Sequence, residues 1–123
     1  MCLRYIGRRY NGEETKKVNE NLALTESTYY ILLSLVKPQH GYGIMQQTER
    51  MSGGRIRLAA GTLYGALTTL TQKRWIEPVG DAPERKKAYR ITTLGRQIAS
   101  AELARLKELV LTAEEIMGGA TDA

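Results

Sequence analysis

Small and hydroxyl-bearing side chains line one side of the segment 60–73, at the spacing of a helix. Leu63, Leu67 and Leu70 fall together on the opposite side and form an apolar face. A helix whose outer surface carries only short side chains can approach another surface closely, and hydroxyl groups can bond to bases or phosphates. This chemistry suits a helix that lies in the major groove of DNA.

The predicted DNA contacts extend from this helix into the segments beside it. Residues at the start of a groove-binding helix meet base edges, and the start of a second helix near residue 42 offers backbone N–H groups to a phosphate. A basic hairpin tip should neutralise phosphates or reach the minor groove. The predicted DNA-binding residues are Thr25, His40, Tyr42, Arg57, Ala60, Gly61, Thr62, Tyr64, Gly65, Thr68, Arg85, Lys86 and Lys87.

Several of these residues, and the single tryptophan, have a second interpretation. Tyr64 either bonds a phosphate through its hydroxyl or packs beneath the hairpin. His40 either hydrogen-bonds locally or touches a phosphate. Arg57 and the basic hairpin tip either contact DNA or are hydrated. Trp75 either anchors the core between the central helix and the hairpin, or offers a stacking surface to an effector.

The charge of the chain is concentrated in its middle. The 123 residues carry a formal charge of +5. Residues 50–96 hold ten Lys and Arg against three Asp and Glu, for a net charge of +7. Residues 97–123 hold two basic and five acidic side chains, for a net charge of −3. The middle segment is therefore a candidate anion-binding surface, although solvated Lys and Arg would give the same composition.

Other classes of function find little support in the sequence. With Cys2 as the single cysteine and His40 as the single histidine, neither a disulfide framework nor a protein-only metal site is expected. Gly53-Gly54 lacks the Lys-Ser/Thr of a phosphate-binding loop, and no catalytic constellation is present, so we expect neither an enzyme nor a cofactor. No apolar run approaches the ~20 residues of a membrane span, and no signal peptide is recognisable, so we expect a cytoplasmic protein.

The apolar periods and turn signals predict a mainly helical fold with a small β-hairpin. Thr25 should cap the first helix and Pro38 should stop it, whereas Ser52-Gly53-Gly54 should end the second. The predicted order is a helix from Thr25 to before Pro38, a connection through His40, helices over 42–51 and 60–73, strands over 77–79 and 85–91, and a helix capped by Thr92 that runs to about Met117. This order is that of a winged helix-turn-helix followed by a dimerisation helix.

The final helix carries an apolar seam typical of a helix that pairs with another. Its members step by 4, 3, 4, 3 and 4 residues, which gives about three heptads of a and d positions. We predict that this seam forms a homodimer through Ala99, Leu103, Leu106, Val110, Ala113 and Met117. The predicted domains are an N-terminal extension at 1–20 (a mobile arm or short helix), a winged helix-turn-helix at 21–92, a dimerisation helix at 93–118 and a frayed tail at 119–123.

From Leu24 to about Gly95 the sequence resembles the PadR family of bacterial transcriptional regulators, in its compact branch with a single C-terminal helix. The matching motifs are Leu24-Thr25-Glu26, Ile31-Leu32 with Leu35, His40-Gly41-Tyr42-Gly43-Ile44, Gly61-Thr62-Leu63-Tyr64, Leu67 and Leu70, Trp75-Ile76, Arg85-Lys86-Lys87-x-Tyr89, and Thr92-x-x-Gly95. The resemblance implies a homodimer that binds a palindromic double-stranded DNA operator. It also implies a repressor that a small aromatic or drug-like effector releases.

The sequence departs from the pattern of this family in three places. Ala59-Ala60 stand where Ser-Pro or Gly-Pro is common, Arg74 stands where Gly is common, and the extension at 1–20 is longer than in many members. One alternative is a winged-helix module that binds a protein partner and no DNA. A MarR-like or ArsR-like regulator is another, but the first usually has more helix before the start of the motif, and the metal-sensing second needs more Cys and His.

Overall fold

The structure, a computed structural model, describes residues 18, 20–83 and 86–118. Apart from Val18 and Glu20, the predicted N-terminal extension lies outside the described residues, as do Arg85 of the predicted DNA-binding set and the tail at 119–123. The chain divides into two compact units. One comprises residues 24–99, and the other contains the described residues 18, 20–23 and 100–118.

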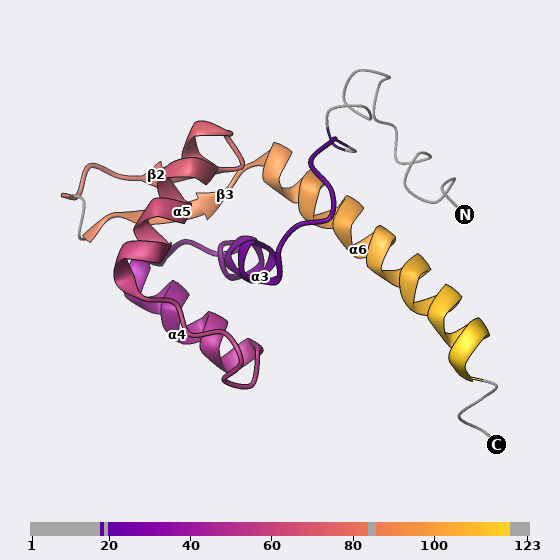
Figure 1. The fold of residues 1–123 in the computed structure, drawn as a ribbon. Helices are drawn as coiled ribbons and strands as arrows, with labels where there is room; N and C mark the ends of the chain where they lie inside the picture. The colour runs from indigo at the N-terminus through magenta and orange to yellow at the C-terminus, as the bar shows by residue number, and fades with distance from the viewer. Residues whose placement is uncertain (1–17, 19, 84–85, 119–123) are drawn as a thin grey trace. The chain divides into compact units, whose positions relative to one another are not determined.

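The unit at 24–99 is a set of short helices with a small sheet (Figure 1). Its elements are α3 (Glu26–Ser34), β1 (Gln39–His40), α4 (Gly41–Met51), α5 (Ala60–Gln72), β2 (Ile76–Val79), β3 (Ala88–Ile91) and the first turns of α6 (Thr93–Ala113). The predicted second and central helices agree with α4 and α5 to within one residue at each end. The predicted fold class, mainly α with a small β wing, is confirmed.

Thr25 begins α3 as the sequence predicts. Its Oγ1 accepts a hydrogen bond from the Thr28 N–H at 3.1 Å, which satisfies one of the donors left open at a helix start. Glu26 occupies the first turn, where the helix dipole favours an acid. The helix ends at Ser34, before Pro38, and buries Ile31 and Leu32. Capping and apolar period are therefore sufficient to predict this helix.

The sheet has three antiparallel strands in the order β1-β3-β2. Ile76 pairs with Ile91 and Val79 with Ala88 across the hairpin. On the other side of β3, His40 pairs with Ala88. The connection predicted through His40 is therefore a two-residue strand, which is too short to carry an alternating pattern.

The return strand begins three residues later than predicted. The prediction started it at residue 85, whereas β3 starts at Ala88, which pairs with the last residue of β2, Val79. The Lys86 N–H donates to the Pro83 carbonyl at 2.8 Å and not to a neighbouring strand, and Lys86 and Lys87 precede the first residue of β3. The prediction that Lys86 and Lys87 belong to the strand was wrong, and they lie at its approach.

The core of this unit lies between the helices and the sheet. Leu63, Leu67 and Leu70 are buried on one side of α5, as predicted, and Tyr89 of β3 is buried as well. Burial of these apolar faces is the main favourable contribution to folding. The other buried apolar side chains of the unit are Ile31, Leu32, Leu35, Ile44, Trp75, Ile76, Ile91 and Ile98.

The end of α5 forms a Schellman motif. The Trp75 N–H donates to the Leu70 carbonyl and the Arg74 N–H to the Thr71 carbonyl, both at 3.0 Å. The motif requires a left-handed residue just past the helix cap, and Arg74 has a φ of 64°. Glycine adopts that conformation without a Cβ penalty, which explains why it is common at this position of the pattern.

Thr92 joins the hairpin to α6. Its hydroxyl donates to the Arg74 carbonyl at 2.6 Å and accepts the Gly95 N–H at 3.0 Å, which confirms the predicted cap. Its own N–H donates to the Trp75 carbonyl at 2.9 Å. A Cβ on Gly95 would collide with that carbonyl, so the Thr92-x-x-Gly95 motif lets the first turn of α6 pack on backbone.

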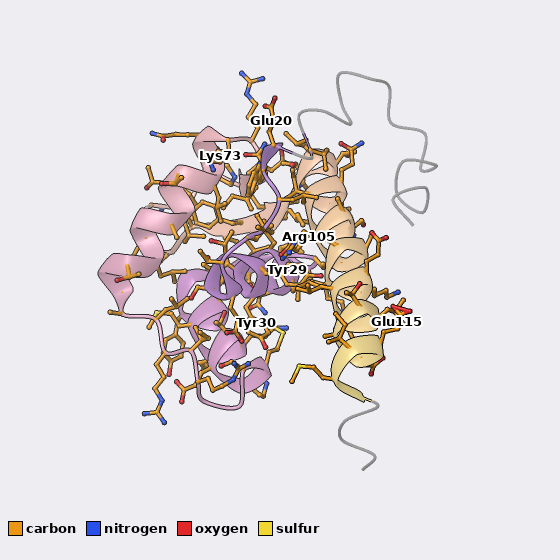
Figure 2. The ribbon with its side chains drawn as sticks, turned by 45° about the vertical axis from the view of Figure 1, so that its right-hand side comes forward. Glu20, Tyr29, Tyr30, Lys73, Arg105 and Glu115 are labelled. Atoms are coloured by element: carbon orange, nitrogen blue, oxygen red, sulfur yellow. The ribbon has the colours of Figure 1, made fainter. Side chains whose placement is uncertain are left out.

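The other unit contains the rest of α6 and the π-helical turn η2 (Glu114–Gly118). The α-helix therefore ends earlier than the predicted Met117, and the π turn continues it. Glu102 is 2% exposed, accepts the Ala23 N–H at 3.2 Å, and receives two bonds from Arg105 at 2.9 and 2.7 Å (Arg105 is labelled in Figure 2). This buried carboxylate ties α6 to residues 20–23.

Candidate nucleic-acid interface

The side of α5 opposite the buried leucines is exposed and uncharged. Five of the predicted DNA-binding residues lie on it, and all of them are exposed: Ala60, Gly61, Thr62, Gly65 and Thr68. Thr69 and Gln72 are exposed as well but were not among the predicted contacts. Helical spacing places both on the same side as the others. We call these seven residues the outer face of α5.

Gly61 in the first turn of α5 and Gly65 in its middle leave two positions of this face without a side chain. A Cβ built on Gly61 or Gly65 would meet no atom within 4 Å, and neither residue has a positive φ. The fold of this chain therefore does not require glycine at either position. Each glycine in a helix interior costs about 1 kcal/mol relative to alanine. What they provide is room above the helix backbone.

The start of α5 has no side-chain cap. Ala59 is the N-cap residue and makes no side-chain bond, and the first backbone bond of the helix joins the Leu63 N–H to the Ala59 carbonyl. The N–H groups of Ala60, Gly61 and Thr62 are thus at the positive end of the helix dipole, where an anion can accept them. Ala59-Ala60 stand in place of a Ser-Pro pair, so no side chain caps the N–H groups at this end of the helix.

Tyr64 packs against the beginning of α4. The side chain is partly buried, and a Cβ on Gly41 would lie 2.7 Å from the Tyr64 hydroxyl oxygen. Gly41 is thus required by close contact. His40 and Tyr42 flank it and are both exposed, Tyr42 by 69%. The helix start therefore gathers three of the predicted DNA-binding side chains, and their phosphate contacts remain predictions.

The predicted contacts outside the helices are exposed but differ in their partners. Arg57 is exposed by 74%, and its Nε lies 3.6 Å from Glu49 Oε2 of α4. Lys86 is exposed and Lys87 partly exposed at the approach to β3. The Thr25 hydroxyl also donates to Thr28 Oγ1 at 2.9 Å, so a phosphate would compete with the cap of α3.

Trp75 lies in the core of the unit at 24–99. Its side chain is 4% exposed, and Nζ of Lys73 (labelled in Figure 2) lies 4.7 Å from the centre of its ring. This position is that of the core anchor, the first of its two interpretations. An effector could stack on the ring only after Lys73 and the surrounding side chains had moved.

A cavity of about 600 Å³ opens between the outer side of α4 and the segment that follows it. Its ionisable side chains are exposed, so it lacks the buried charged groups typical of a catalytic centre. Among the described residues no three His, Cys, Asp or Glu side chains gather as metal ligands would. The cavity is lined by Tyr42, Met45, Gln46, Glu49, Arg50, Gly53, Gly54 and Leu58.

The described helices include none that is long and apolar enough to cross a membrane.

The predicted dimerisation seam follows an exposed apolar side of α6, and its last member, Met117, lies in η2. Leu103, Val110 and Met117 are exposed by 44%, 53% and 67%, Ala113 is exposed, and Ala99 and Leu106 are partly exposed. Large apolar side chains are seldom exposed in series without a partner. The sequence reasoning missed Leu109 and Ile116, which are exposed by 55% and 73%. They are seven residues apart, so the heptad count could have found them.

Comparison with known proteins points to regulators of transcription. The family described as transcriptional regulator PadR-like matches residues 30–101. A 37.1 kDa protein in transposon Tn4556 of Streptomyces fradiae is 35% identical over 72 residues, which cover 58% of this chain and only 20% of that protein.

Solved structures show the same fold. A PadR family regulator from Clostridium difficile is 19% identical with a TM-score of 0.63, and the match covers 76% of this chain and 99% of that one. A PadR-like transcription factor from Bacteroides fragilis is 24% identical with a TM-score of 0.57, covering 87% and 99%. A PadR family regulator from Eggerthella lenta is 20% identical with a TM-score of 0.59, covering 84% and 87%.

Proposed function

Because this chain belongs to the PadR-like family of transcriptional regulators, we propose that it is a homodimeric repressor that binds a palindromic DNA operator through α5. The family establishes a regulator that is not an enzyme. The observation that carries DNA binding is the outer face of α5, which is exposed, uncharged and bare at Gly61 and Gly65. A major groove admits such a helix, whereas acidic side chains on this face would be repelled by the DNA phosphates.

Phosphate contacts on either side of α5 would fix its position in the groove. The open N–H groups at the start of α5 can bind one phosphate, and the exposed Tyr42 and His40 lie at the start of α4. Lys86 and Lys87 supply cations at the hairpin. Such contacts carry affinity, and the base contacts of α5 carry specificity.

The exposed apolar side of α6 supports the homodimer. A second copy of the same helix would cover Leu103, Val110 and Met117, together with Leu109 and Ile116. Two copies place two α5 helices on one duplex, and half-sites about one DNA turn, ~34 Å, apart would form an inverted repeat. Repression and release by a small effector follow from the family resemblance, and the buried Trp75 is not assigned that role.

The test is selection of bound duplexes from a random DNA pool at two salt concentrations, followed by sequencing. We expect an inverted repeat to be enriched. Affinity should fall with salt with a log–log slope of about 0.9 for each neutralised phosphate. Binding without an enriched sequence would indicate a non-specific architectural protein. No binding at low salt would reject the proposal and favour the protein-interaction module.

Two variants test whether the hairpin lysines contribute to DNA binding beyond the net charge of the protein. Lys86→Ala with Lys87→Ala should lower the salt slope by about 1 for each phosphate that is no longer neutralised, and should weaken binding to all sequences alike. The matched control is Lys107→Ala, an exposed lysine of α6 outside residues 24–99. Because the control removes one charge and the hairpin variant removes two, an effect of Lys107→Ala half as large as that of the hairpin variant would show that only net charge matters. A promoter reporter that carries the selected repeat then distinguishes repression from activation.

A further inference from the structure

We propose that Thr68 determines part of the operator sequence, because its hydroxyl can only accept a hydrogen bond from a base. It would select adenine or cytosine, whose amino groups are the donors of the major groove. The inference rests on the proposed DNA binding by α5 and specifies the chemistry of one position within it.

The internal hydrogen bond of Thr68 fixes the direction of its hydroxyl. Thr68 Oγ1 lies 3.0 Å from the Tyr64 carbonyl oxygen. A carbonyl oxygen has no proton to give, so the hydroxyl donates its single proton to it. The lone pairs of Oγ1 remain, and these can only accept. A threonine hydroxyl without this bond could present either a proton or a lone pair to a base.

The position of Thr68 on the outer face of α5 makes this oxygen accessible. Thr68 is exposed, and Gly61 and Gly65 lie on the same side of the helix, where a Cβ would meet no atom within 4 Å. No side chain at those two positions therefore stands between Oγ1 and a base edge. Thr71 makes the same kind of bond to the Leu67 carbonyl, at 2.7 Å, but it is partly buried on the other side.

The major groove distinguishes bases by donors and acceptors. Adenine N6 and cytosine N4 are donors, whereas guanine O6 and thymine O4 are acceptors. An acceptor-only oxygen bonds the first pair and repels the second. One such bond should favour the amino base by roughly three- to tenfold, which corresponds to ~0.7–1.4 kcal/mol.

The first experiment repeats the random-pool selection with variants. Thr68→Val keeps the shape of the side chain and removes the oxygen, Thr68→Ser keeps the oxygen, and Thr71→Val is the matched control for the inner hydroxyl. We expect wild type, Thr68→Ser and Thr71→Val to enrich adenine or cytosine at one position of each half-site. Thr68→Val should lose that preference at that position alone. Unchanged preference in Thr68→Val, or an equal loss at every position, would overturn the inference.

The second experiment changes the DNA, so it does not depend on the folding of a variant. At the assigned position, the base is replaced by an analogue without its amino group, such as purine for adenine. Wild type should bind this duplex three- to tenfold more weakly, and Thr68→Val should bind both duplexes equally. Equal binding of both duplexes by wild type would refute the role of Thr68 and leave DNA binding intact. Failure of wild type to enrich any sequence would instead reject the proposed function.

Discussion

Arg74 adopts a backbone conformation that is unfavourable for a residue with a Cβ. It lies at the left-handed position after α5, with a φ of 64°, and its N–H donates to the Thr71 carbonyl. A residue with a Cβ costs about 1–2 kcal/mol more than glycine in this conformation. The Schellman motif forms nevertheless, because Trp75 is buried beyond it and holds the chain in place.

Arg74→Gly should therefore stabilise the protein. We expect the free energy of unfolding to rise by about 1 kcal/mol, as strain at the left-handed residue is removed. Gln72→Gly is the matched control, since it places glycine in the exposed last turn of α5 and should lower stability by about 1 kcal/mol. Urea denaturation of both variants tests this. A loss of stability in Arg74→Gly would show that the arginine side chain contributes more than its backbone strain.

Short-range residue chemistry could be predicted from the sequence, and close approach could not. The caps at Thr25 and Thr92 depend on residues three positions away, so local pattern was sufficient. The contact of Tyr64 with Gly41 joins residues far apart in the chain, and no local pattern encodes it. The direction of the Thr68 hydroxyl is likewise visible only once the helix exists.

At the scale of the elements, one glycine of α4 and one of α5 have opposite surroundings. Gly41 is glycine because Tyr64 of α5 lies against it, whereas Gly65 faces open space. The first glycine is a requirement of helix packing. The second is a cost that the fold bears without any internal benefit. Replacement of each glycine by alanine should therefore change the stability of the protein in opposite directions.

Gly41→Ala should lower the unfolding free energy by about 1–3 kcal/mol, because the added methyl overlaps the Tyr64 hydroxyl. Tyr64→Phe in the same chain should restore part of the loss. Gly65→Ala should instead raise stability by about 1 kcal/mol and, on the proposed function, weaken operator binding. Thermal unfolding and DNA titration measure the two effects. If Gly65→Ala improves both stability and DNA binding, the absence of a side chain at this position of the outer face of α5 has no role in recognition.

The elements themselves differed in how far they could be predicted. The helices were predictable because each buries a repeating apolar face, as Leu63, Leu67 and Leu70 do in α5. β1 was missed because two residues carry no period, and its existence depends on pairing with β3. The start of β3 was set by where β2 ends, which is information from another segment.

At the scale of the whole molecule, the apolar side of α6 predicts the oligomeric state. Val110→Glu places a charge at a position that is 53% exposed within the chain, so it should leave the fold of one copy intact and separate the proposed dimer. Thr112→Glu adds the same charge at an exposed position off the seam and should leave a dimer. Sedimentation equilibrium at micromolar concentration reports the mass of each. Two dimers would mean that the copies associate elsewhere.

The seam was visible in the sequence, but its width and its neighbour were not. Alternation of steps of three and four identified Val110 and Met117. It gave no weight to Leu109 and Ile116, which widen the apolar side. Nor could it show that Glu102, one heptad before Leu109, would be buried by the Ala23 N–H and by Arg105. From the sequence alone, a charged residue at such a position is expected to be exposed to solvent.

The single residue between β3 and α6 has a consequence for how such proteins diverge. Thr92 is the only residue between β3 and α6, so the first turn of α6 is held in a fixed position next to the hairpin. One residue inserted after Ala99 would turn the later seam by about 100° around the helix axis, whereas seven would restore its face and advance it by about 10.5 Å. In the proposed dimer, the direction in which the seam faces is thus set by the number of residues between Thr92 and the first seam residue, so only insertions that preserve the heptad would keep the two copies paired.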